Sequence, residues 1–403
     1  MIYRHTQKQI QDYYDNPALN QSALKAILKM GVQEFIREKD EAIHEDEKYY
    51  EDKEHFLIGK GVDVLITEGR EVFDTSYFYS KLQKKPSEKP MAIVKKVFES
   101  IEPEKRAIAL GVHRWELYEA MNSITDKEGN VGWYMNLKIP SEKTKNGQPD
   151  LRQWVEDKRH ELLLKDGTCQ AYWTELLEAG GKQVLSEEQH AKIWDIYQSL
   201  TSHRFTHHLF EDGEDVDVIF QLPLYWEEEV PIIVADDGGV ARVEVVRQEM
   251  KCMLDEVRIE HKRKTIVELD IKTTRLPITK FAKQVEWRRY DVQGSVYTQG
   301  LNKCRGRISE LIGRDVSDYH LSNFAFVAES TTSPGCPLIF VLKPETLEVG
   351  MIGDGDEKRG WMDALKDYKQ MEFYGFDVGK MMDRKKGVVW INKEFEDNIT
   401  HFL

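Results

Sequence analysis

The stretch VELDIKTT, from Val267 to Thr274, decides the fold that we expect for this chain of 403 residues. Polar and apolar residues alternate along it, which is typical of a β-strand whose successive side chains point to opposite faces of a sheet. The residues that we expect in the core are Val267, Leu269 and Ile271. Their polar neighbours on the other face are Glu268, Asp270 and Lys272. A polar row of this kind predicts that the face lines a site.

The segment before this strand, KCMLDEVRIE, also has the composition of a strand and carries Asp255. A tight turn centred on Lys262 and Arg263 would place Asp255 directly opposite Asp270, with the Cβ atoms about 5 Å apart. Two carboxylates at that separation repel each other unless a cation joins them. Mg²⁺ binds one or two carboxylates and keeps several waters, which leaves room for phosphate oxygens.

Lys272 beside such a metal could hold a hydroxide or stabilise the charge that develops on a phosphate group. The three residues therefore indicate metal-assisted phosphodiester hydrolysis. The alternative is a surface hairpin in which Asp255 or Asp270 forms an ion pair with Lys272.

A long helix is predicted to follow, from about Ile278 to Asn302. Gln293 and Tyr297 lie four residues apart on one face of it, and Arg289 lies one turn earlier on the same line. These side chains could contact a phosphate backbone while the apolar side of the helix packs on the sheet. Alternatively, Gln293 and Tyr297 tie the helix to the loop after Lys272, and both interpretations remain open.

Taken together, these elements resemble the PD-(D/E)XK nucleases. Asp255, the triplet Asp270-Ile271-Lys272 and the helix segment Gln293 to Tyr297 follow the order and spacing of that pattern, including the QxxxY motif of its RecB-like branch. The resemblance implies an α+β fold with a restriction-endonuclease-like core, in which helices flank a mixed central sheet. It gives catalytic positions to Asp255, Asp270 and Lys272. It gives DNA-binding or positioning roles to Gln293, Tyr297 and Arg289.

The resemblance narrows to the RecE-like exonuclease family. The segments that carry it include NPALNQSALKAILKM, GKGVDVLITEG, CMLDEVRI, ELDIKTT and RRYDVQGSVYTQGL. It implies an exodeoxyribonuclease dependent on Mg²⁺ or Mn²⁺ that degrades double-stranded DNA from an end, in phage-type recombination. It also implies a homo-oligomer around DNA and a single-strand annealing protein as a partner. An endonuclease of the same fold and a DNA-binding protein that has lost cleavage remain as alternatives.

Two positions depart from the family pattern. Asp63 stands in GKGVD where related sequences have a histidine, and as a carboxylate it could be a third metal ligand beside Asp255 and Asp270. The same substitution would also mark a repurposed site, or Asp63 could face solvent on a helix. Gln221, in FQLPLYW, stands where related sequences often have an acidic residue, and it could hold a water or play no catalytic part.

The order of elements along the chain predicts three parts. Residues 1–101 form the N-terminal part of the nuclease domain, and residues 183–403 form its core and C-terminal elements. Residues 102–182 read as a helical insertion or subdomain, interrupted by the loop-like SEKTKNGQPD. The glycine-rich GDGDEKRG, Gly353 to Gly360, reads as a turn, because its acidic residues would repel a phosphate group.

The composition excludes several other classes of protein. The formal net charge of −14 is unlike that of proteins that coat nucleic acid non-specifically. The positive charge is instead concentrated between His261 and Tyr290, around the DxK triplet. The four cysteines form no CxxC pair, which disfavours a zinc ribbon, a clustered iron-sulfur site or a disulfide scaffold. No apolar run is long enough for a signal peptide or a membrane span, so we expect a cytoplasmic protein without a membrane partner.

Overall fold

The computed structural model describes residues 1–42, 54–124, 138–143, 149–153, 163–165, 167–235, 241–355 and 357–376. It divides into two compact units, one of residues 1–70 and 192–403 and the other of residues 71–191. The fold of the larger unit is α+β, with a mixed central sheet flanked by helices. Within these ranges, no helix is long and apolar enough to cross a membrane.

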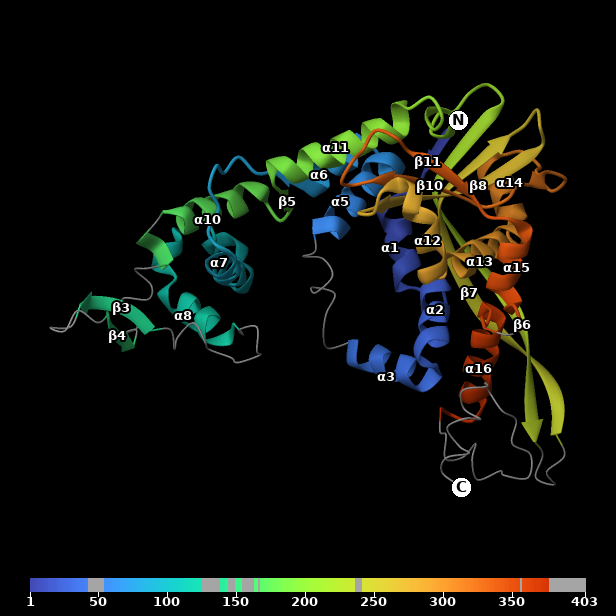
Figure 1. Ribbon diagram of the computed structural model, residues 1–403, viewed down its shortest axis with the longest axis horizontal. Helices are drawn as coiled ribbons and strands as arrows, with labels where there is room; N and C mark the ends of the chain where they lie inside the picture. Colours follow the sequence, from blue (N-terminus) through green and yellow to red (C-terminus); the bar gives the residue numbers. More distant parts are fainter. Residues whose placement is uncertain are drawn as a thin grey trace. The chain divides into compact units, whose positions relative to one another are not determined.

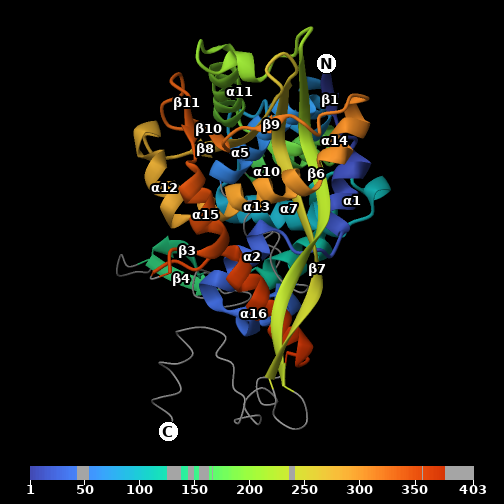
Figure 2. The same cartoon turned by 90° about the vertical axis from the view of Figure 1, so that its right-hand side faces the viewer.

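The larger unit is built on a mixed sheet with the strand order β1-β6-β7-β8-β10-β11, and β9 also pairs with β8. Strands β6 and β7 form a long antiparallel hairpin, visible in Figure 2. Strand β8 pairs antiparallel with β7 and parallel with β10. The strands are β1 (Ile2–Arg4), β6 (Val216–Ala235), β7 (Ala241–Glu260), β8 (Thr265–Thr274), β9 (His320–Leu321), β10 (Ala325–Ser330) and β11 (Leu338–Val341).

Helices cover both faces of this sheet. On one face α2, α13 and α16 pack beside the β6–β7 hairpin (Figures 1 and 2), around a core that includes Val292, Val296 and Trp361. On the other, α5 brings Gly59 against Thr273 of β8, and α11 reaches β10. The helices of this unit are α1 (Gln7–Asp15), α2 (Gln21–Met30), α3 (Val32–Ala42), α5 (Glu54–Asp63), α12 (Phe281–Trp287), α13 (Tyr290–Lys303), α14 (Arg305–Ile312), α15 (Pro344–Ile352) and α16 (Trp361–Phe373). Helices α6 (Arg70–Ser76) and α11 (Glu187–Ser202) cross the unit boundaries.

Strand β8 departs from the expected division into a core face and a site face. Two residues of the polar face, Glu268 and Asp270, are fully buried. They are as inaccessible to solvent as the apolar Leu269, which is 1% exposed. The face that carries Asp270 also carries Ile266, which belongs to the main core beneath α13. Helix α13 therefore covers part of the polar face, where Gln293 contacts Asp270 and Thr298 contacts Glu268.

The long helix expected from Ile278 to Asn302 is also broken. A short 3-10 turn, Ile278–Lys280, leads into α12, and α13 begins again at Tyr290. The break is at Arg289, whose backbone is left-handed with φ of 49°. A left-handed residue cannot continue a right-handed helix, so the stripe predicted from Arg289 through Gln293 does not exist.

The smaller unit extends beyond the insertion predicted at residues 102–182. Helix α7 (Glu88–Ser100) lies upstream of that range, yet its Ile93 and Val97 share one core with Leu117 and Trp173. Burial of α7 against its neighbours explains the wider boundary. The other elements are β2 (Tyr77–Tyr79), α8 (Arg114–Ser123), β3 (Lys138–Lys143), β4 (Pro149–Gln153), α10 (Thr168–Ala179) and β5 (Gln183–Leu185), so the unit is not purely helical.

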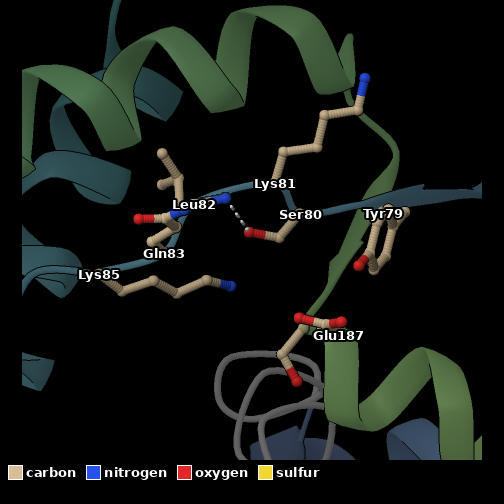
Figure 3. A pocket seen from close by; sticks show the side chains of 8 residues that line it. Tyr79, Ser80, Lys81, Leu82, Gln83, Lys85 and Glu187 are labelled. Carbon is tan, nitrogen blue, oxygen red and sulfur yellow. Dashed lines mark hydrogen bonds between the residues drawn. The ribbon is translucent and has the colours of Figure 1, made fainter.

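A polar pocket of about 280 Å³ lies in the smaller unit (Figure 3). Its wall includes Ser80, whose hydroxyl donates to the buried carboxylate of Glu175. Lys85 and Glu187 also line it. None of the residues predicted for the site belongs to this unit or lines this pocket.

Close packing of α15 on α13 generates a prediction. A Cβ atom added at Gly350 would lie 2.2 Å from the carbonyl oxygen of Asp291, a backbone atom that cannot rotate away. Gly350→Ala should lower the free energy of unfolding by roughly 2 kcal/mol or more. The control is Gly306→Ala in α14, where nothing lies within 4 Å of the added Cβ and where alanine should be neutral or stabilising by roughly 0.5 kcal/mol. Urea unfolding that gives the two variants the same midpoint would contradict this packing.

Candidate functional site

The β7–β8 hairpin brings the two predicted aspartates together. Its ladder runs from Glu260 opposite Thr265 to Glu256 opposite Leu269. One further step in the same register places Asp255 opposite Asp270, as a turn centred on Lys262 and Arg263 requires. In antiparallel strands, opposed side chains lie on the same face. The two carboxyl groups are therefore neighbours.

Each aspartate is held by a specific hydrogen bond. Asp270 is fully buried, and its Oδ1 accepts a hydrogen bond from Nε2 of Gln293 on α13 at 2.6 Å. Its other oxygen forms an ion pair with Lys272. Asp255 reaches the neighbouring strand, where its Oδ2 accepts the backbone N–H of Ile271 at 2.9 Å. Both carboxyl groups are thus fixed in position rather than free to rotate.

The charges of this group act strongly on one another. Burial raises the pKa of Asp255 well above its usual range, and the negative charge of Asp270 raises it further. Burial alone would lower the pKa of Lys272, but the charges of Asp270 and Asp255 outweigh it and the net shift is upward. Lys272 is therefore an ammonium at neutral pH. It can donate hydrogen bonds and stabilise negative charge, but it cannot accept a proton as a general base.

Asp63 lies at the end of α5 and does not face solvent freely. Its side chain is partly buried, and its Oδ2 accepts a hydrogen bond from Nε2 of Gln221 at 3.4 Å. Burial raises its pKa to about 7, opposed by the positive charge of Lys272 and assisted by the negative charges of Glu68 and Asp270. A π-helical turn, Val64–Glu68, follows directly, and such turns are frequent at functional sites.

Gln221 connects Asp63 to the sheet. Its backbone is left-handed, with φ of 49°, and it interrupts the β6–β7 ladder between Phe220 opposite Glu256 and Leu222 opposite Leu254. By register it is the residue opposite Asp255. A left-handed backbone at a residue other than glycine is strained and tends to occur at functional sites. This amide is therefore a structural partner of Asp63, a role that its sequence position did not indicate.

The donor set suits a hard divalent cation. No three His, Cys, Asp or Glu side chains of the described residues converge closely enough to form a complete metal site. Asp255 and Asp270 supply oxygen donors side by side, however, and Mg²⁺ commonly takes only one or two carboxylates with waters. Burial raises the pKa of Asp255 and the negative charge of Asp270 raises it further, and a cation between the two carboxylates would offset that repulsion. The residues present therefore fit Mg²⁺ or Mn²⁺.

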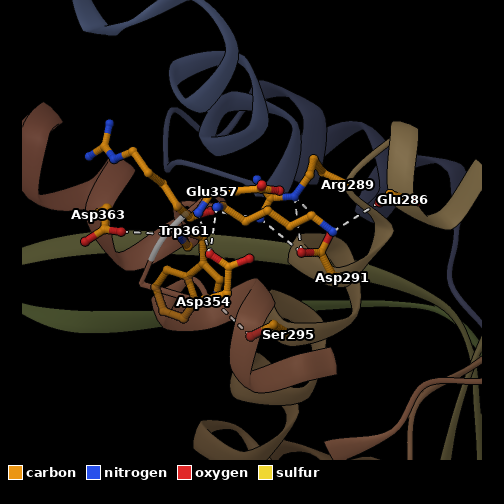
Figure 4. Close-up of polar contacts among 11 residues, drawn as sticks. Glu286, Arg289, Asp291, Ser295, Asp354, Glu357, Trp361 and Asp363 are labelled. Atoms are coloured by element: carbon orange, nitrogen blue, oxygen red, sulfur yellow. Dashed lines mark hydrogen bonds and ion pairs between the residues drawn. The ribbon is translucent and has the colours of Figure 1, made fainter. Parts of the chain in front are cut away.

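Arg289 does not lie with Gln293 on one helical stripe. Its guanidinium donates three hydrogen bonds of 3.0 to 3.1 Å to the carboxylate of Asp291 and one of 2.7 Å to the carbonyl of Arg359 (Figure 4). In the same region Asp354 accepts the backbone N–H groups of Glu357 and Lys358. Arg289 thus anchors the loop that carries Arg359 to the start of α13, and its DNA-contacting role stays a prediction.

The structure favours a supporting role for the QxxxY pair. Gln293 is 4% exposed and Tyr297 is 7% exposed, so neither offers much surface to a substrate. The Tyr297 ring packs edge-on against Phe324, with centroids 6.0 Å apart. Gln293 acts on the site through Asp270. The helix is tied to the aspartate itself and not to the loop after Lys272.

Two residues near Lys272 escaped the sequence analysis. The ammonium of Lys272 lies 5.8 Å from the centroid of the Tyr290 ring, and that of Lys25 on α2 lies 5.5 Å from the same centroid. Lys25 belongs to the segment NQSALKAILKM, where only its apolar neighbours gave a recognisable pattern. Because 247 positions separate Lys25 from Lys272 in the sequence, only the tertiary fold could reveal that both reach one ring.

A second polar pocket of about 320 Å³ opens beyond the end of β8. Arg275 lies three residues after Lys272, and the pocket extends from it to α5, α11 and the end of β10. Its lining residues are Glu54, His55, Ile58, Lys192, Arg275, Thr331 and Thr332. Space lined by polar side chains is therefore available next to the strand that carries the DxK triplet.

Glu268, the third member of the polar row, is a buried acid whose ionisation should control stability. Burial raises its pKa to about 8, against the hydrogen bond from Thr298 and the charge of Arg305. The unfolded chain loses this proton near its ordinary value of 4.5. The folded state therefore holds the proton more tightly, so stability should fall as pH rises from about 4.5 to about 8.

Glu268→Gln should remove this pH dependence. We expect unfolding free energies close to wild type at pH 5, because the buried acid is then neutral like the amide. Above pH 8 the variant should be the more stable protein, by an amount on the order of 3 kcal/mol. The exposed Glu310→Gln on α14 is the matched control and should follow the wild-type profile. Parallel urea-unfolding profiles for wild type and Glu268→Gln would refute the assignment.

Comparison with known proteins gives a likeness in structure but not in sequence. No family model matches this chain, and no curated protein matches it. A crystal structure of a "putative exonuclease" from Eubacterium rectale is similar at a TM-score of 0.35 and 11% sequence identity, over 96% of this chain and 88% of that chain. Any function of this chain must therefore be inferred from its own residues.

Proposed function

We propose that this protein is a metal-dependent deoxyribonuclease that hydrolyses phosphodiester bonds of double-stranded DNA from an end. The observation that carries the proposal is the group formed by Asp255, Asp270 and Lys272. Two carboxyl groups oppose each other across a hairpin, one is held by Gln293, and a protonated lysine lies beside them. The same residues carry the resemblance to the PD-(D/E)XK pattern.

Each residue of this group has a separate role in the proposed hydrolysis. Asp255 and Asp270 would hold the metal, and Asp63 would be the candidate third ligand. A bound Mg²⁺ supplies neutralising charge for the phosphate and lowers the pKa of water. Lys272 donates hydrogen bonds to the oxygen that gains negative charge in the transition state and orients the attacking water. Gln293 keeps the Asp270 carboxylate in one orientation, as partners of metal ligands commonly do.

The RecE-like resemblance is the basis for proposing an exonuclease instead of another nuclease. The proposal also includes double-stranded DNA as substrate, a single-strand annealing protein as a partner, a homo-oligomer around the DNA and a cytoplasmic setting. The same active-site chemistry would also serve an endonuclease. A DNA-binding protein that lost cleavage would need no pair of repelling carboxylates, and both predicted aspartates are present here with specific hydrogen bonds.

Lys272→Ala should abolish cleavage. We expect the rate on end-labelled linear duplex to fall by ~10³-fold, because an electrostatic stabiliser of the transition state is lost. DNA binding should change little. The assay compares linear duplex with a covalently closed circle in Mg²⁺, Mn²⁺ or EDTA. The control is Lys264→Ala, an exposed residue at the β7–β8 turn, which should cleave at the wild-type rate.

The outcomes separate the alternatives. Metal-dependent loss of the linear substrate alone, absent in Lys272→Ala, supports the exonuclease. Cleavage of the closed circle would show that the protein is an endonuclease and not an exonuclease. Wild-type protein that is folded, binds metal and cuts neither substrate is a binding protein, and the proposed activity is then wrong.

Metal binding should stabilise the fold through the two aspartates. At a Mn²⁺ concentration 100 times the dissociation constant, linkage predicts about 2.7 kcal/mol of added stability. Thermal unfolding should show this shift for wild type and lose it in Asp255→Asn and Asp270→Asn. The exposed Asp12→Asn on α1 is the control and should keep the shift. Asp63→Asn tests the third ligand, and an unchanged Mn²⁺ response in that variant would remove Asp63 from the metal site.

A further inference from the structure

Two lysines from distant parts of the chain meet at the ring of Tyr290. Lys272 approaches it from β8 at 5.8 Å and Lys25 from α2 at 5.5 Å, measured from each Nζ to the ring centroid. Tyr290 is itself fixed, because its ring lies 5.0 Å from that of Phe326 and 6.0 Å from that of Phe281. The aromatic ring thus holds two positive groups at one place beside the carboxylates.

A third cation, Arg288, lies at the C-terminal cap of α12, two residues before Tyr290. Burial and the positive charges of Lys272 and Arg288 lower the pKa of Lys25 to about 8, against the negative charges of Asp270 and Asp291. Arg288 also acts electrostatically on Tyr290. Like charges gathered in partly buried surroundings repel one another, so the group is costly unless something negative joins it.

The nearby carboxylates are already engaged. Asp270 is paired with Lys272 and hydrogen-bonded to Gln293, and Asp291 receives three hydrogen bonds from Arg289. In the part of the chain that the structure describes, no ion pair or hydrogen bond involves the Lys25 ammonium. Lys25 and the exposed Arg288 are therefore available to an anion from outside the protein.

We propose that Lys25 and Arg288 bind a phosphate group of the substrate strand next to the phosphate group that reacts beside Lys272. This inference rests on the proposed function and adds a backbone-binding site to it. Successive phosphates follow one another along a strand, so cations next to Lys272 meet the neighbour of the reacting group. The group reads no base, and it holds the strand in place while the adjacent bond is cut.

Helix α2 gives Lys25 the rigidity that positioning requires. Asn20 caps the helix by accepting the N–H of Ala23 at 2.9 Å. Leu24 and Ile27 are fully buried in the main core at 0% and 1% exposure. The backbone of Lys25 is therefore held in place, and its ammonium lies at the ring of Tyr290.

The test is the salt dependence of DNA binding by Lys25→Met. A short duplex is titrated by fluorescence anisotropy at several salt concentrations, with Ca²⁺ in place of Mg²⁺ and a gel to check that the duplex stays intact. Loss of one phosphate contact should reduce the slope of log affinity against log salt by about 0.9, and the affinity at low salt should fall several-fold. Arg288→Met should act in the same way.

Two variants separate this role from a structural one. Lys25→Arg keeps the charge and should restore the wild-type slope. Lys29→Met removes an exposed lysine one turn further along α2 and should leave the slope unchanged. A wild-type slope in Lys25→Met, or an equal loss in Lys29→Met, would overturn the inference.

Cleavage kinetics keep this inference distinct from the proposed activity. If wild type cleaves, Lys25→Met should raise KM several-fold with a smaller change in kcat, because uniform binding is lost. Cleavage by wild type with an unchanged KM and slope in Lys25→Met would overturn the phosphate site alone. No cleavage by wild type, together with a reduced slope in Lys25→Met, would overturn the nuclease and leave the DNA site in place. Wild type that neither cleaves nor binds the duplex would refute both.

Discussion

The buried ion pair between Lys272 and Asp270 is the interaction around which the rest of the site is arranged. Asp270 is fully buried, whereas the Lys272 side chain keeps 22% of its surface exposed. Removing one partner from such a pair leaves an uncompensated charge and typically costs about 3–5 kcal/mol. Strand β8 supplies both residues, and their positions two apart place them on one face. The hydrogen bond from Gln293 then fixes how α13 lies across that strand.

A pair of this kind does not neutralise the site. Asp255 and Asp63 add two more carboxyl groups, and the pKa of each is raised by burial before any neighbour is considered. The protein therefore keeps acidic groups where a purely structural hairpin would place neutral ones. Lys25 and Arg288 likewise add positive charge close to Lys272. Opposite charges kept apart in this way are suited to a ligand that carries both signs, such as a divalent cation on a phosphodiester.

Sequence alone predicted the part of the site that depends on local pattern. Alternation along β8 and the length of the β7–β8 turn were enough to place Asp255 opposite Asp270, because strand register follows from turn geometry. The α+β class followed from the order of strands and helices. Residue spacing wrongly placed Arg289 on one helical stripe with Gln293, because the helical period does not reveal a left-handed residue. The partner of Arg289, Arg359, is also 70 residues away in the sequence. Spacing failed again for Glu268, since alternation cannot show that a helix covers the polar face.

The two departures from the RecE-like pattern that the sequence resembles meet in the structure. The side chains of Asp63 and Gln221 are hydrogen-bonded to each other. An acid at both positions would add a fourth carboxyl group and further raise the pKa values of the others. With an amide at position 221, the carboxyl group of Asp63 gains a donor instead of a repelling neighbour. The pairing of Asp63 with Gln221 therefore gives the Asp63 carboxyl group a hydrogen-bond donor and keeps a further negative charge away from Asp255.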